Sequence, residues 1–175
     1  MIDIWGKIAR KYEKEPPIAG YDILNESWVY NSFVRDLDGS QVDAFYLKVI
    51  TAIRRVDPNR MIFLEPANMH TFMFPLKENI VWSPHYYPLS FAPKYYPQNI
   101  TVLEADLAAK YKTFVLEMGS PIWIGEFGAF MKDPSNTLWV QDAVKLFSKY
   151  QIGSAYWAFH GTSDSLVLAA LFPAS

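Results

Sequence analysis

Carboxylate side chains follow two short apolar segments of this sequence, and their type and position suit acid–base chemistry. Glu26 comes directly after the segment 18–24 and its following Asn25, and Glu126 comes directly after the segment 121–125. One carboxyl group of such a pair can donate a proton while the other attacks carbon or activates water. This division of roles is the one that glycoside hydrolysis requires.

Aromatic residues accompany these carboxylates. His85 and Tyr87 follow the apolar segment 80–83 and share one face of an extended chain, so both can point into the same space. Trp157 lies in the last apolar segment, 152–159. Because an indole ring can stack on the apolar face of a sugar ring, this set indicates a carbohydrate site.

Each of these residues also has a purely structural interpretation, and only their combination favours chemistry. An acidic residue at the end of a strand is more often a helix cap or a surface charge than a catalytic group. Glu65, which precedes Pro66, is interpreted as a structural residue that caps its loop. His70 and His160 are interpreted as solvated or hydrogen-bonded loop residues.

The elements that must position these residues alternate between short apolar strands and amphipathic helices. Strands are expected at 18–24, 61–64, 80–83, 121–125 and 152–159. Helices are expected at 4–12, 42–56, 103–118, 140–150 and 166–172, and a structured loop is expected at 85–98. This alternation predicts an α/β fold with parallel strands, whose carboxyl ends meet at one rim.

Composition excludes several other classes of protein. The 175 residues are 51% hydrophobic and 17% aromatic, which excludes a disordered chain. A net charge of −2 argues against a nucleic-acid-binding surface. The absence of Cys excludes a thiolate nucleophile and a Cys-ligated metal. No apolar stretch is long enough for a transmembrane segment, and no glycine-rich phosphate loop occurs.

Four motifs in order make the sequence recognisable. They are GYDILNES, VWSPHYYPL, PIWIGEFGAF and SAYWAF, and they resemble the motifs of glycoside hydrolase family 5, the cellulase family. The resemblance implies a retaining (β/α)8-barrel glycosidase. It places residues 1–175 in the carboxyl-terminal part of the catalytic domain, as strands four to eight with their helices, with strands one to three absent. The expected fold is therefore a partial TIM barrel.

The resemblance also implies roles for individual residues. Glu26 is expected to be the general acid/base and Glu126 the nucleophile. The residues expected to bind substrate or orient these carboxylates are Asn25, His85, Tyr87 and Trp157. No metal or organic cofactor is implied, and family members of this kind are secreted.

Two departures from the family pattern have consequences. Ser27 stands where the family usually has Pro, which loosens the loop after the expected acid/base. The second departure is the absence of strands one to three, since a whole barrel takes about 250 residues. We therefore expect weak or no hydrolysis from this chain alone, unless it associates with itself or pairs with a missing amino-terminal half.

The expected substrate is a β-linked glucan, with endoglycoceramidase-like action on a glycolipid or mannanase specificity as alternatives. A rival hypothesis is a non-catalytic carbohydrate-binding module or inactive barrel fragment, against which the retention of both carboxylates argues. A third hypothesis is an unrelated doubly wound binding protein. That class would carry a nucleotide-type loop after a strand, and the sequence has none.

Overall fold

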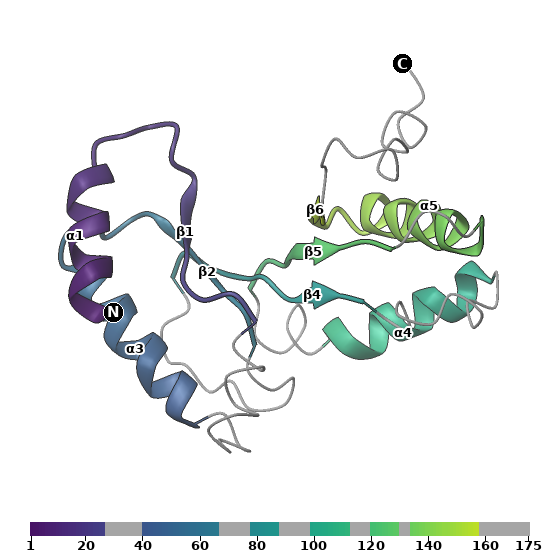
Figure 1. The fold of residues 1–175 in the computed structure, drawn as a ribbon, viewed down its shortest axis with the longest axis horizontal. Coiled ribbons are helices and arrows are strands. Elements are labelled where there is room, and N and C mark those ends of the chain that lie inside the picture. The colour runs from purple at the N-terminus through teal and green to yellow at the C-terminus, as the bar shows by residue number, and fades with distance from the viewer. Residues whose placement is uncertain (27–39, 67–77, 88–98, 113–119, 130–133, 158–175) are drawn as a thin grey trace. The chain divides into compact units, whose positions relative to one another are not determined.

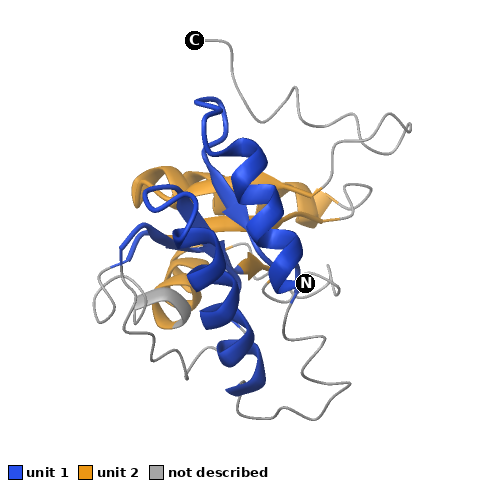
Figure 2. Cartoon of the chain, turned by 90° about the vertical axis from the view of Figure 1, so that its left-hand side faces the viewer, with its two compact units in different colours: residues 1–84, 118–121 blue, residues 85–117, 122–175 orange. Residues whose placement is uncertain are grey.

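The chain is organised as two compact units. The computed structural model describes residues 1–26, 40–66, 78–87, 99–112, 120–129 and 134–157, without the side chains of 110–112. Unit 1 comprises 1–84 and 118–121, and unit 2 comprises 85–117 and 122–175 (Figure 2). The described part of each unit contains a parallel sheet of three strands.

Unit 1 is a β-α-β arrangement preceded by a helix. Its sheet has the order β1 (Gly20–Asp22), β2 (Met61–Leu64), β3 (Ile80–Trp82). Helix α1 (Ile2–Tyr12) precedes β1, and α3 (Ser40–Arg54) lies between β1 and β2 in the chain. The two helices pack against each other (Figure 1). A helix between two parallel strands is the expected crossover, because parallel strands cannot be joined by a tight turn.

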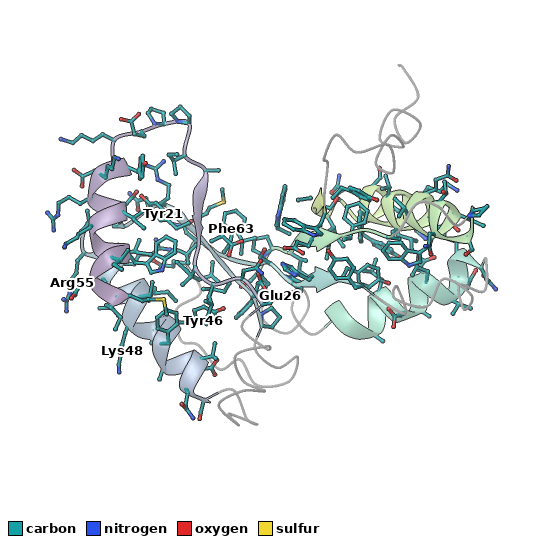
Figure 3. The ribbon with its side chains drawn as sticks, in the orientation of Figure 1. Tyr21, Glu26, Tyr46, Lys48, Arg55 and Phe63 are labelled. Carbon is teal, nitrogen blue, oxygen red and sulfur yellow. The ribbon has the colours of Figure 1, made fainter. Side chains whose placement is uncertain are left out.

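The core of unit 1 follows from the apolar stripe of α3. Its buried residues recur three or four positions apart, as one face of a helix requires; they are Val42, Tyr46, Val49, Ile50 and Ile53. On the same helix Lys48 is exposed, and it lies on the outer side in Figure 3. From the sheet, Ile62 and Leu64 are fully buried. Burying each such side chain contributes about 1.5–3 kcal/mol of transfer free energy.

Arg60 joins the end of α1 to the turn before β2. Its guanidinium donates to the carbonyl oxygens of Tyr12, Glu13 and Ile18 at 3.2, 2.8 and 2.6 Å. It also pairs with the carboxylate of Asp57 at 2.9 Å. The carbonyls at a helix end lack partners within the helix, and Arg60 supplies donors to those of Tyr12 and Glu13 while also binding Ile18 in the segment that leads into β1.

Unit 2 contains the other sheet. Its order is β4 (His85–Tyr86), β5 (Trp123–Phe127), β6 (Gly153–Tyr156). Helix α4 (Ile100–Lys112) lies between β4 and β5 in the chain, and α5 (Pro134–Lys149) lies between β5 and β6. The helices pack on each other, and α5 also packs on β6 (Figure 1).

Aromatic rings form the core of unit 2. Phe127 on β5 makes edge-to-face contacts with Phe147 at 5.0 Å and with Tyr156 at 5.5 Å between ring centroids. Tyr86 on β4 stacks on Trp139 of α5 at 6.3 Å. Aromatic pairs in these geometries add about 0.5–1.5 kcal/mol each beyond the area they bury. The high aromatic content of the sequence is thus used to fix β4 and β5 against α5.

Several strand boundaries differ from the sequence-based expectation, and two of the differences concern the site. The segment 85–98 was expected to be a loop, but His85 and Tyr86 form β4 and pair with Glu126 and Phe127. The strand expected at 121–125 instead runs from Trp123 to Phe127, so Glu126 lies within it. The expected helix at 166–172 falls outside the described residues. Among the described helices, none has the length and apolar character needed to cross a membrane.

Candidate active site

The six residues expected to form a site are divided between the two units. Asn25 and Glu26 belong to unit 1, whereas His85, Tyr87, Glu126 and Trp157 belong to unit 2. Each group lies at or just beyond the carboxyl end of its strands, where parallel α/β folds place their chemistry. Ser27, His70 and His160 lie outside the described residues.

In unit 2 the sheet itself positions Glu126. Glu126 is directly opposite His85 in the β4–β5 register. The Tyr87 hydroxyl donates to Glu126 Oε2 at 3.0 Å, and His85 Nδ1 lies 3.5 Å from the same oxygen. At 3.5 Å the contact from His85 is too long for a good hydrogen bond. As the alternation of the chain predicted, the side chains of His85 and Tyr87 point the same way, and both contact the Glu126 carboxylate.

Partial burial makes these contacts around Glu126 stronger. The Glu126 side chain is 17% exposed and the His85 side chain is 8% exposed. An electrostatic interaction grows as water is excluded, so partial burial strengthens the hydrogen bond from the Tyr87 hydroxyl to Oε2. The other carboxylate oxygen can then attack an electrophilic carbon. The arrangement around Glu126 therefore suits a nucleophile.

Trp157 follows β6 and presents an open surface. It is 63% exposed, and its backbone N–H donates to the Phe127 carbonyl oxygen at 2.9 Å. A Cβ atom at Gly128 would collide with the Trp157 carbonyl oxygen, so this glycine permits the close approach of the two segments. The indole is thereby held one residue past β6, with most of its surface available for stacking.

Tyr156 supports the segment that follows Glu126. Burial raises the pKa of the Tyr156 phenol, which therefore stays protonated at neutral pH. Its hydroxyl donates to the Ala129 carbonyl oxygen at 3.3 Å. The Tyr156 hydroxyl on β6 thus holds the segment just beyond β5, and the Trp157 N–H holds the last residue of β5, Phe127.

In unit 1 the acidic residue lies beyond the strand rather than within it. Glu26 comes four residues after the end of β1, and its φ angle is +49°. This left-handed conformation costs a residue with a Cβ atom about 1–2 kcal/mol. The Glu26 N–H donates to Glu65 Oε2 at 2.6 Å, a charge-assisted hydrogen bond that offsets this strain. Asn25, beside it, is exposed.

Glu65 is the residue whose importance the sequence interpretation missed. It follows β2 directly and is 3% exposed, a degree of burial unusual for a carboxylate. Its position at the carboxyl end of a strand was the available signal. Its partner is 39 residues away in the chain, so no local pattern in the sequence could connect the two.

Sequence comparison assigns the chain to a known group. The family model for cellulase, glycosyl hydrolase family 5, matches residues 1–163. None of the curated proteins gives a significant match to the sequence.

Solved structures share the fold. Endo-glycoceramidase II from Rhodococcus sp., solved with a cellobiose-like imidazole, has a TM-score of 0.73 at 19% identity over 97% of this chain. A hyperthermophilic endo-β-1,4-glucanase has a TM-score of 0.75 at 21% identity over 94%. Thermotoga maritima Cel5A, solved with mannotriose, has a TM-score of 0.70 at 20% identity over 94%.

The chain spans about half the length of these enzymes, namely 44% of the endo-glycoceramidase and 59% of each of the other two. Likeness at this level of identity establishes the fold. The expectation of a partial (β/α)8 barrel is therefore confirmed.

Proposed function

Because this chain belongs to the cellulase family, glycosyl hydrolase family 5, we propose that it carries the two catalytic carboxylates of a retaining β-glycosidase. Glu126 is the nucleophile and Glu26 the general acid/base. The observation that supports this most directly is the pair of contacts from Tyr87 and His85 to one oxygen of Glu126. They leave the other oxygen available to bond with carbon.

The reaction proceeds in two displacements. In the first, a Glu126 oxygen bonds to the anomeric carbon, the glycosidic C–O bond breaks, and Glu26 gives its proton to the departing oxygen. In the second, Glu26 takes a proton from water, whose oxygen bonds to the anomeric carbon and releases Glu126. Two inversions leave the anomeric configuration unchanged. The mechanism requires the two carboxyl groups to be about 5–5.5 Å apart.

The remaining residues have supporting roles in this proposal. Asn25 holds the sugar 2-hydroxyl, and Trp157 supplies the surface on which a sugar ring stacks. His85 and Tyr87 orient Glu126 and stabilise its charge. We assign β1, β2 and β3 to barrel strands four, five and six, and β5 and β6 to strands seven and eight.

The proposed substrate is a β-linked glucan. The sequence segments GYDILNE and FLEP favour a glycolipid headgroup as the second candidate, because they resemble endoglycoceramidase-like members of the family. Mannan is the third candidate. Release of reducing sugar from cellooligosaccharides, from a ganglioside and from mannooligosaccharides, measured in parallel, separates the three.

The test of the proposed reaction is hydrolysis of an aryl β-cellobioside, followed by proton NMR. We expect the β-anomer of cellobiose to appear first, and we expect Glu126→Gln to abolish its release. Glu104→Gln is the matched control, because it removes a carboxylate from an exposed part of unit 2. First appearance of the α-anomer, or full activity in Glu126→Gln, would contradict the proposal. A chain that binds cellobiose but forms no covalent adduct with a 2-fluoro glycoside would support the binding-module hypothesis instead.

A further inference from the structure

Glu65 connects the end of β2 to the residue proposed as general acid/base. Its carboxylate is almost completely buried, with 3% of the residue exposed. Oxygen Oε2 accepts a hydrogen bond from the backbone N–H of Glu26 at 2.6 Å. Both residues belong to unit 1, so this contact lies within one compact part of the chain.

The contact acts on a strained point of the backbone. Glu26 has a φ of +49°, a conformation in which a side chain with a Cβ atom is disfavoured. Such a residue stays in place only when its surroundings hold it there. A short hydrogen bond from its own N–H to a charged acceptor is such a restraint, since it fixes the peptide plane from which the Glu26 side chain departs.

Glu65 is itself anchored from the other side. The hydroxyl of Tyr46, a fully buried residue of α3, donates to the Glu65 backbone carbonyl oxygen at 3.0 Å. Figure 3 labels Tyr46 on α3 and Glu26 on the segment that follows β1. The helix thus holds the Glu65 backbone, and the Glu65 carboxylate holds the Glu26 backbone.

We propose that Glu65 is a positioning residue, which sets the direction of the Glu26 carboxyl group by fixing the left-handed turn at Glu26. The inference rests on the proposed function, because it assumes that Glu26 is the general acid/base. Burying a carboxylate is unfavourable unless it is compensated, and the N–H of Glu26 supplies part of that compensation. A residue that only capped its own loop would have no such link to Glu26.

This role affects the donation of a proton by Glu26 more than the attack of Glu126 on carbon. A proton donor must lie within hydrogen-bond distance of the departing oxygen, and a misplacement of about 1 Å can lower a rate about 100-fold. Dinitrophenolate departs without a proton, whereas phenolate needs one. Losing the correct direction of Glu26 should therefore slow hydrolysis of phenyl β-cellobioside far more than hydrolysis of 2,4-dinitrophenyl β-cellobioside.

The experiment compares Glu65→Ala and Glu65→Gln with the parent chain. Glu15→Ala is the control, because it removes an exposed carboxylate from the same unit. Two quantities are measured: hydrogen exchange at the Glu26 amide, and kcat/KM for the two substrates. We expect Glu65→Ala to lose the amide protection and to lower kcat/KM about 100-fold for the phenyl glycoside, but less than about threefold for the dinitrophenyl glycoside. Glu65→Gln keeps an acceptor oxygen of the same reach, so it should retain most of the amide protection at Glu26 and most of kcat/KM for the phenyl glycoside.

Several results would overturn the inference. One is unchanged amide exchange at Glu26 in Glu65→Ala. Another is that, in each of Glu65→Ala and Glu65→Gln, kcat/KM falls by the same factor for the phenyl and the dinitrophenyl glycoside. If Glu65→Ala fails to fold, Glu65→Asp decides, because its shorter side chain should lose the contact with the Glu26 N–H and lower the phenyl-to-dinitrophenyl ratio of kcat/KM, which a purely structural defect leaves unchanged. If the parent chain hydrolyses neither substrate, covalent labelling of Glu126 by 2,4-dinitrophenyl 2-deoxy-2-fluoro-β-cellobioside decides the proposed function, and amide exchange at Glu26 decides whether Glu65 holds the turn.

Discussion

The two candidate carboxylates are held in different ways. Glu126 lies inside β5, where backbone pairing with β4 fixes its position opposite His85. Glu26 lies beyond β1 in a left-handed turn, and a single side chain from another strand end holds its backbone N–H. The comparison teaches that the position of the proposed nucleophile is set by the sheet, whereas the position of the proposed acid/base depends also on a long-range contact with Glu65. The two should therefore respond differently to substitution.

The largest expected effect comes from removing each carboxylate in turn. Glu126→Ala should lower kcat/KM about 10⁴-fold or more on every aryl glycoside, because every turnover needs the nucleophile. Glu26→Ala should lower kcat/KM strongly for phenyl β-cellobioside. It should lower the rate of the glycosylation step only slightly when the leaving group is dinitrophenolate. Rates with both substrates for both variants check this. Equal leaving-group dependence in the two variants would remove the proposed distinction between the carboxylates.

The second effect concerns the support beneath Glu126. Phe127→Ala removes a ring that is 4% exposed and contacts Phe147 and Tyr156. It should lower the free energy of unfolding by about 3–5 kcal/mol. Urea denaturation followed by tryptophan fluorescence measures this change.

Ile4→Ala is a suitable comparison for Phe127→Ala, because Ile4 is 57% exposed on α1 and should matter little. If Phe127→Ala cost as little as Ile4→Ala, the aromatic core would not be what holds β5 in place.

A third, smaller effect tests the contact on the carboxylate itself. Tyr87→Phe removes the hydroxyl that donates to Glu126 Oε2. Loss of one such donor should lower kcat about 100-fold or more, with little change in KM, because the donor stabilises the negative charge that returns to Glu126 when the glycosyl–Glu126 bond breaks. Steady-state kinetics on the dinitrophenyl glycoside are the measurement. An effect confined to KM would mean that Tyr87 only binds substrate.

The smallest effect lies away from both carboxylates, between α4 and α5. The Lys149 ammonium, and then the Tyr150 hydroxyl, lower the pKa of Glu104 below its ordinary value of 4.5. A carboxylate with a depressed pKa in the folded state stabilises the fold above its unfolded pKa, and this stabilisation is lost as pH falls through the folded pKa. Glu104 raises the pKa of Lys149 above its ordinary value of 10.5. Lys149 therefore stabilises the fold below that value, and this stabilisation is lost as the pH rises through the folded pKa.

Denaturation of Lys149→Gln and the parent tests this pair. The parent should be slightly more stable at about pH 6, and the difference should shrink as the pH falls below the folded pKa of Glu104. High salt should also reduce the difference, because the pair is exposed. A difference that stays constant from neutral to strongly acidic pH would show that the ion pair is not its cause.

The sequence predicted those features that local patterns encode. Strand β2 was expected at 61–64 and is found there, and α3 and α5 were expected from their apolar stripes. The face shared by His85 and Tyr87 follows from strand alternation alone. These features depend on periodicity and on breakers such as Pro58, which act within a few residues of where they stand.

Other features depend on contacts that no local pattern records. The two residues of β4 follow Pro84 and form a strand only because β5 lies beside them. The left-handed conformation of Glu26 is disfavoured for a glutamate, so its sequence gave no sign of it. Glu65 was interpreted as a loop cap because its partner comes much earlier in the chain.

The most direct test of the account is the identity of the residue that bonds to the sugar. The chain is incubated with 2,4-dinitrophenyl 2-deoxy-2-fluoro-β-cellobioside, digested with pepsin, and sequenced by mass spectrometry. The labelling needs only the first displacement, so the adduct is detected even where turnover is slow. The account predicts one fluorocellobiosyl group on the peptide containing Glu126, and none in Glu126→Gln. A sugar attached to Glu26 or Glu65, or hydrolysis of ordinary glycosides with inversion and without any adduct, would contradict it.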